Sequence, residues 1–115
     1  MGQVKVARIR ELNDAFRKSL RDGPAVPGRI MVTAGVDANG PDFVLKVLNA
    51  VAGFDNFSEA NDPHGEHDFG NFEVDGDKIY FKVDYYDANC VYGSEDPTDT
   101  TKTTRVLTIM LAKEY

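Results

Sequence analysis

Residues 69–86 restrict the fold more than any other segment, because their apolar side chains alternate with other residues at a period of two. Phe72 and Val74 precede the turn Asp75-Gly76-Asp77, and the alternation resumes in residues 79–85. Two such runs separated by an Asp-Gly pair predict a β-hairpin. The turn centres on either Asp75-Gly76 or Gly76-Asp77, and both registers place the same apolar residues inward.

Two segments have the apolar spacing of amphipathic helices. In residues 4–21 the apolar side chains recur at steps of three or four: Ile9, Leu12, Phe16 and Leu20. Gly23 and Pro24 are expected to end this helix, and Gly53 is expected to close a second helix that begins near Pro41. We expect the basic residues of the first helix to lie on solvated faces: Arg8, Arg10, Arg17, Lys18 and Arg21.

Two further segments are predicted to form strands. Residues 29–34 are short, β-branched and bounded by glycines, which predicts a buried strand. Residues 103–112 are apolar on both faces, as in an interior strand. The resulting order, α-β-α-β-β-β, predicts a single acidic α+β domain over residues 1–115. Its mainly antiparallel sheet has about four strands, and the two helices pack on one face.

Charge is divided unequally along the chain. Residues 1–50 carry eight Lys/Arg against five Asp/Glu, and residues 51–115 carry five against fourteen, so the halves have net charges of +3 and −9. From Asp55 to Asp99 thirteen carboxylates accompany only Lys78 and Lys82, a net charge of −11. This distribution predicts a strongly negative face. It argues against direct nucleic-acid binding, which needs clustered Lys and Arg.

Targeting signals and disulfides are not expected. Cys90 is the only cysteine, so no disulfide can form within the chain. The first ten residues lack the apolar core of a signal peptide, and no run reaches the roughly 18 apolar residues of a membrane span. We therefore expect a cytoplasmic protein without a membrane partner.

Both histidines of the chain lie in the acidic segment 61–68. His64, Glu66, His67 and Asp68 are the candidate metal ligands, because imidazole and carboxylate groups suit zinc or a non-haem metal. The segment contains Pro and Gly, so helical spacing cannot align the ligands. We therefore expect no metal or other cofactor, and expect these side chains to order the loop. A general acid or base role for Glu66 or His67 is an alternative, for which no nucleophile is evident.

The outward face of the hairpin and the acidic loop that follows it supply candidates for partner binding. Tyrosines offer rigid apolar area with a polar tip, which is common at protein interfaces. The candidate contact residues are Asp75, Asp77, Tyr80, Asp84, Tyr86, Asp87, Glu95 and Asp96. An ordinary solvated sheet face is the alternative.

Several blocks of sequence carry a resemblance to a known family. They are residues 12–17, 61–70, 84–87, 92–94 and 103–112. With these blocks the chain resembles a family of small uncharacterised bacterial proteins, a domain of unknown function that is often carried on mobile elements beside anti-restriction genes. The resemblance supplies no catalytic residues. It implies a context in which small acidic proteins inhibit host defence, including anti-CRISPR and anti-restriction proteins.

The acidic half and this resemblance together lead us to expect a non-enzymatic inhibitor that acts as a DNA mimic. Its partner would be the basic, nucleic-acid-handling surface of a CRISPR surveillance complex or a restriction enzyme. One alternative is a metal- or small-ligand-binding protein or enzyme centred on the His64–His67 loop. Another is a homodimer or other homo-oligomeric module, in which Arg17, Lys18 and Arg21 meet the acidic half of a second copy.

Overall fold

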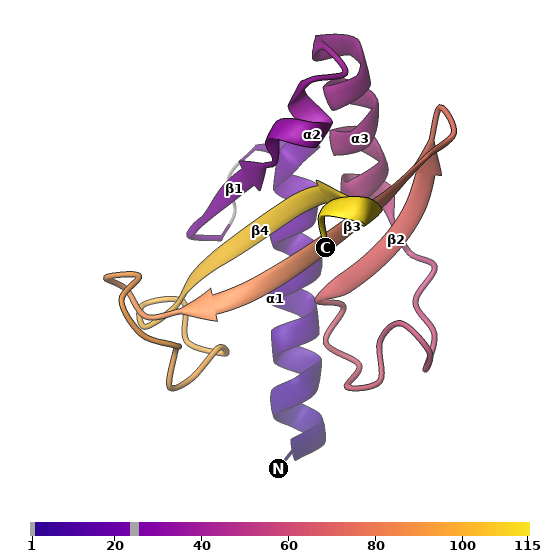
Figure 1. Cartoon of the computed structure of the whole chain (residues 1–115). Helices are drawn as coiled ribbons and strands as arrows, with labels where there is room; N and C mark the ends of the chain where they lie inside the picture. Colours follow the sequence, from indigo (N-terminus) through magenta and orange to yellow (C-terminus); the bar gives the residue numbers. More distant parts are fainter. Residues whose placement is uncertain (1, 24–25) are drawn as a thin grey trace.

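A four-stranded sheet organises the molecule (Figure 1). This computed structural model describes residues 2–23 and 26–115. The strand order is β1-β4-β3-β2, with β1 (Gly28–Val32), β2 (Phe69–Val74), β3 (Asp77–Tyr86) and β4 (Thr104–Leu111). β4 pairs in parallel with β1 and antiparallel with β3, while β2 and β3 are antiparallel. The predicted α+β class and mainly antiparallel sheet are confirmed, and the parallel β1 makes the sheet mixed.

The predicted hairpin is formed by β2 and β3. Val74 lies opposite Asp77, so the turn consists of Asp75 and Gly76, the first of the two alternatives. Both turn residues have positive φ, 51° at Asp75 and 86° at Gly76, as a two-residue type I′ turn requires. Ile79, Phe81 and other inward residues of the hairpin are buried, and the intervening side chains lie on the opposite face.

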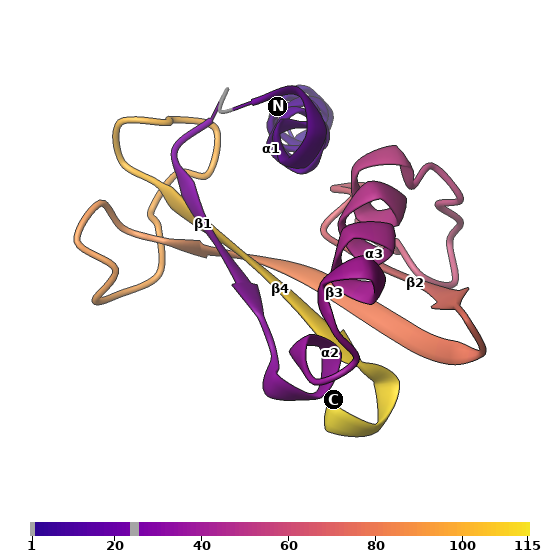
Figure 2. The same ribbon diagram turned by 90° about the horizontal axis from the view of Figure 1, so that it is seen from above.

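Helices α1 (Gly2–Asp22) and α3 (Pro41–Gly53) lie on one face of the sheet (Figure 2). Ile9, Leu12 and Phe16 of the apolar stripe of α1 are buried as predicted, and Leu20 is partly buried. Helix α1 ends before Gly23, whose φ is 96°; Pro24 lies outside the described residues. Pro41 occupies the first turn of α3, and Gly53 is its last residue, as expected. Phe43, Val47 and Val51 turn toward the sheet and join the core. The other face of the sheet carries neither α1 nor α3, and we call it the open face.

Two short helical segments were not predicted. Helix α2 (Ala34–Asp37) lies between β1 and α3, and the 3-10 helix η1 (Ala112–Glu114) follows β4. The Glu114 carboxylate accepts hydrogen bonds from the Thr33 hydroxyl at 2.7 Å and the Gly35 amide at 3.1 Å. These contacts connect the C-terminal segment to the end of β1. Segments of three or four residues are too short to show an amphipathic period.

The prediction of a buried strand at residues 29–34 is wrong. β1 is an edge strand, and the side chains of Ile30 and Met31 are 44% and 56% exposed. An apolar, β-branched run indicates that a segment fits a sheet, but the neighbours of a strand determine its burial. β4 has a strand on both sides and is interior, as its sequence predicted.

Candidate functional site

The open face of the sheet carries a group of aromatic side chains. Tyr80 of β3 packs edge-to-face against Phe69 and Tyr115, with ring centroids 5.4 and 5.3 Å apart. We call these three residues the open-face cluster. Tyr86 lies on the same face and is 37% exposed, and Tyr115 is 73% exposed. The predicted outward alternation of the hairpin thus presents tyrosines on the side of the sheet away from α1 and α3.

Acidic side chains flank this cluster. Asp75 and Asp77 lie at the exposed tip of the hairpin. Asp75 forms an exposed salt bridge with Lys46 of α3, at 3.0 Å. Asp84 pairs with Lys82 at 2.8 Å, and this hydrogen bond raises the pKa of Lys82 above its ordinary value. Exposed pairs of this kind are weak, so the carboxylates can exchange partners at little cost.

In the loop between β3 and β4, carboxylates hold the backbone. Asp87 accepts hydrogen bonds from three following amides, and Asp96 accepts from the amide and hydroxyl of Thr98. The bonds from Thr98 lower the pKa of Asp96, and equivalent bonds from Thr101 lower that of Asp99. Glu95 is exposed beside them. Asp87 and Asp96 therefore have a structural role in addition to the contact role predicted for them.

The four candidate metal ligands lie in separate surroundings. The His67 ring stacks on Phe57 at 3.8 Å, and its Nδ1 lies 2.9 Å from Asp14 Oδ1. Glu66 accepts a hydrogen bond from the Tyr85 hydroxyl at 2.8 Å, whereas His64 is exposed. Burial and the nearby Glu66 raise the pKa of Asp68. Within residues 2–23 and 26–115, no three His, Cys, Asp or Glu side chains are grouped to hold a metal ion.

A buried polar network joins this loop to helix α1. Asn13 is fully buried, and its amide donates to the Glu66 carbonyl at 2.9 Å and the Tyr85 hydroxyl at 2.7 Å. Arg105 of β4, also fully buried, donates from Nε to Asn13 Oδ1 at 2.7 Å and from Nη2 to the Pro97 carbonyl at 2.7 Å. Burial raises the pKa of Tyr85 far above its ordinary value. The network fixes both long loops against α1.

Arg17 corrects the expectation that the basic residues of α1 are all solvated. Its side chain is only 2% exposed. The guanidinium donates to the carbonyls of Val51 and Phe54 at 3.2 and 3.0 Å, and it forms an ion pair with Asp14. It therefore satisfies carbonyls at the C-terminus of α3, where a positive charge is favourable. Burial lowers the pKa of Arg17, and Asp14 opposes this shift.

The sequence contained one signal for this buried arrangement. Ile9, Asn13 and Arg17 follow one another at steps of four, which places all three on one face of the helix. Ile9 is a core residue, so its polar successors point toward the same interior. Arg105 likewise lies inside a strand whose other inward residues are apolar, and the alternation of β4 places it with Leu107 and Ile109.

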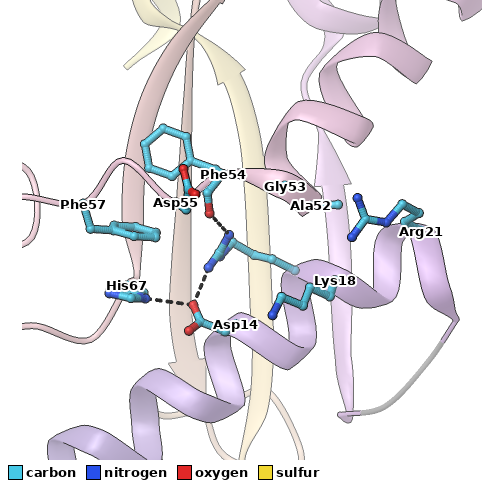
Figure 3. Close-up of a pocket in the computed structure, with 10 residues that line it drawn as sticks. Asp14, Lys18, Arg21, Ala52, Gly53, Phe54, Asp55, Phe57 and His67 are labelled. Atoms are coloured by element: carbon cyan, nitrogen blue, oxygen red, sulfur yellow. Dashed lines mark hydrogen bonds and ion pairs between the residues drawn. The ribbon is translucent and has the colours of Figure 1, made fainter.

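An open cavity of about 420 Å³ lies where α1 meets the end of α3 (Figure 3). His67 and Phe57 form one side of it, and Lys18, Arg21 and Asp55 also line it. The pairing of His67 with Asp14 could hold or move a proton. The described lining residues include no serine, threonine or cysteine that would act as a nucleophile. The cavity therefore provides charged binding groups from α1 and from the loop that follows α3.

Comparison with known proteins identifies a family. The family described as "Protein of unknown function (DUF3768)" matches residues 32–114. The chain belongs to this family. The expected membership of a family of unknown function is thereby confirmed, while the association with mobile elements and host defence stays a prediction. No curated protein and no solved structure matches the chain.

The matched segment begins at the end of β1 and includes Phe69 and Tyr80 of the open-face cluster, the acidic hairpin and both long loops, and it ends one residue before Tyr115. Helix α1, which supplies Asn13 and Arg17, lies outside it. None of the helices in the described parts of the chain combines the length and apolar character needed to cross a membrane.

Proposed function

We propose that this protein is a non-enzymatic binding protein that covers a basic surface of a protein partner with its open face and acidic hairpin. The observation that carries the proposal is the open-face cluster, in which Phe69 and Tyr80 lie on β2 and β3 and Tyr115 packs against both. The tip of the same strand pair bears Asp75 and Asp77. Aromatic side chains provide the contact area, and the carboxylates provide steering and charge pairing with Lys and Arg.

The charge distribution supports a basic partner. The segment from Asp55 to Asp99 has a net charge of −11, and it contains β2, β3 and the loops on either side of them. Charges at exposed positions accelerate association with a complementary surface and lose this effect at high salt. A basic surface that handles nucleic acid matches this charge. The resemblance adds the finer proposal that the surface belongs to a host defence complex.

Affinity capture with a matched pair of variants tests the proposal. The test variant carries Asp75→Lys and Asp77→Lys, and the control carries Asp37→Lys and Asp42→Lys on exposed positions of α2 and α3. Each pair changes the net charge by the same amount, from −6 to −2. We expect wild type and control to retain a specific basic protein from host lysate, with release by moderate salt, and the test variant to lose it.

Equal capture by both variants would reject the hairpin as the contact site. Mass spectrometry of the retained protein tests the finer proposal, because a nuclease or a surveillance-complex subunit would support it and an unrelated basic protein would contradict it. Tyr80→Ser separates the two parts of the surface. It removes aromatic area without changing charge, so we expect it to accelerate dissociation, whereas the charge variant slows association.

A second candidate function is a small-ligand site at the cavity beside His67. One observation favours it, which is that Lys18, Arg21 and His67 line the same open cavity. Thermal unfolding with added inorganic phosphate tests this candidate. A rise in Tm that disappears in the Arg21→Gln variant would support it, and an unchanged Tm would contradict it.

A further inference from the structure

The free edge of β1 carries unpaired backbone groups whose positions follow from its ladder with β4. The Pro27 carbonyl accepts from the Arg105 amide at 3.4 Å, and the Thr33 amide donates to the Ile109 carbonyl at 3.0 Å. The backbone amides and carbonyls of alternate residues in a strand point to the same side. The backbone groups of the odd-numbered residues of β1 therefore point toward β4. The amides and carbonyls of Gly28, Ile30 and Val32 therefore point away from the sheet, and none has a hydrogen-bond partner in the described part of the chain.

This edge has little of the protection that edge strands usually carry. Natural proteins protect such edges with charges, prolines, bulges or a covering element. The sequence of β1 is Gly-Arg-Ile-Met-Val, so its only charge is on Arg29. Ile30 and Met31 are among the exposed large hydrophobic residues of the molecule. The strand thus offers both unpaired backbone groups and apolar side chains to a partner.

We propose that β1 pairs antiparallel with β1 of a second copy about a twofold axis at Ile30, which joins the two sheets into one. In this register Ile30 lies opposite Ile30 of the other copy, and Gly28 lies opposite Val32 on each side. These are hydrogen-bonded pairs, so each exchanges two backbone hydrogen bonds and every free amide and carbonyl of the three residues is satisfied. A twofold interface needs such a self-complementary surface.

The side chains are compatible with this register. Arg29 lies opposite Met31 of the second copy, so no like charges face each other across the strands. The two diagonal neighbours of Arg29 are Arg29 and Thr33 of the second copy. The hydroxyl of Thr33 holds the Glu114 carboxylate in each copy, which places a negative charge beside each arginine. Thr33, Thr108 and Glu114 line one cavity on the open face. The register of β1 with β4 places Arg29 on the same face. An Arg29–Glu114 charge pair can therefore form twice in the dimer.

The strand order also reduces electrostatic repulsion between the copies. β1 and β2 are opposite edges of the sheet, and the tip with Asp75 and Asp77 belongs to the β2 side. The dimer therefore keeps the two acidic hairpins apart and leaves both available to a partner. This pairing differs from the homo-oligomer predicted from the sequence, in which Arg17 took part, because Arg17 is buried.

Light scattering coupled to size exclusion tests the dimer across a concentration series. We expect a mass that approaches twice the chain mass of 12.7 kDa. Ile30→Pro removes an outward amide that β4 does not use, so it should reduce the mass to that of one chain. Ile30→Val keeps the amide and serves as the matched control, which should remain dimeric. A wild-type mass of one chain at the highest soluble concentration would overturn the proposal, as would a dimer that survives Ile30→Pro.

Amide exchange of the wild-type protein, followed by NMR, provides a test that does not depend on the folding of a variant. As the protein concentration rises, the fraction of monomer falls. The amide exchange rates at Gly28, Ile30 and Val32 should fall by the same factor. Exchange at Arg29 and Met31, whose amides face β4, should change much less. Equal slowing of neighbouring residues, or no slowing, would contradict pairing at this edge.

Discussion

Two ion pairs of this molecule use the same chemistry in opposite surroundings. Arg17 and Asp14 meet beneath the α1–α3 contact, where the arginine is 2% exposed. Lys46 and Asp75 meet at the hairpin tip, where the side chains are 59% and 54% exposed. A buried cation exchanges its water for protein partners, as the two terminal nitrogens of Arg17 do, although its buried Nε has no partner within the described residues. An exposed cation retains most of its hydration. The comparison separates charges that maintain the fold from charges that are available to a partner.

The buried pair is part of a larger arrangement that joins distant segments. Arg17 connects α1 to the end of α3, and Asp14 connects α1 to His67 in the following loop. Asn13, one helix position earlier, connects the same helix to Tyr85 and Arg105. The exposed pair connects only two surface side chains. The interior network therefore positions the loops, whereas the charged side chains at the hairpin tip lie outside this network.

The largest effect is expected from Arg17→Ala. The substitution leaves Asp14 without its cation, leaves the Val51 and Phe54 carbonyls without this donor, and removes the contact of the guanidinium with the Phe57 ring. We expect the free energy of unfolding to fall by about 3 kcal/mol, as measured by urea denaturation. Removing one partner of a buried ion pair typically has a cost of this size.

Lys18→Ala is the matched control for this prediction. Lys18 is the next residue of the same helix and is exposed, so its substitution should change the free energy of unfolding by no more than about 0.5 kcal/mol. Similar losses in both variants would mean that helix propensity or total charge, rather than burial, determines the effect.

A smaller effect is expected from Tyr85→Phe. The Tyr85 hydroxyl accepts from Asn13 and donates to Glu66, so its removal breaks two hydrogen bonds of the buried network. We expect a loss of about 1 to 2 kcal/mol in the free energy of unfolding. Tyr86→Phe is the neighbouring control on the open face and should have almost no effect. Equal stability of the two variants would contradict a stabilising role for the network.

The ionisation of Tyr85 gives a second measurement of its surroundings. Burial raises the pKa of Tyr85 far above its ordinary value, so the folded protein keeps a proton that the unfolded chain loses above about pH 10. The unfolded state then binds fewer protons, and stability must fall as the pH rises further. Absorbance near 295 nm should show no Tyr85 ionisation before alkaline unfolding. The Tyr85→Phe variant should lose only the tyrosinate signal that accompanies unfolding.

Sequence patterns predicted the local elements well and the burial of particular residues less well. The hairpin was predictable because its period, the position of its turn within residues 75–77 and the inward set of residues all follow from local geometry, while the choice between the two turn registers required the structure. The exposure of β1 was not predictable, because it depends on the strand order and on the absence of a second neighbour. The helix-capping role of Arg17 also required the position of α3, which lies far along the chain.

The candidate site was predictable to a similar extent. Alternation in β3 placed Tyr80, Asp84 and Tyr86 on the outward face, but the contribution of Tyr115 depends on the turn at the C-terminal segment. The sequence analysis also predicted Asp87, Asp96 and Asp77 alike as contact residues. The hydrogen bonds of Asp87 and Asp96 show that these two order the loop. Spacing identifies the residues that share a face. The hydrogen-bond partners that reduce their availability become known only from the fold.

The smallest expected effect is the coupling between Lys46 and Asp75. A double-mutant cycle with Lys46→Gln and Asp75→Asn isolates the interaction, and Asn is well tolerated at the positive φ of Asp75. We expect a coupling of about 0.2 to 1 kcal/mol that disappears in high salt, since water and ions screen both groups. A coupling above about 2 kcal/mol, or one that persists in high salt, would mean that the tip is rigidly ordered by its ion pair. Asp75 would then have a structural role and would not be available to a basic partner. The contact surface would consist of Asp77 and the open-face cluster.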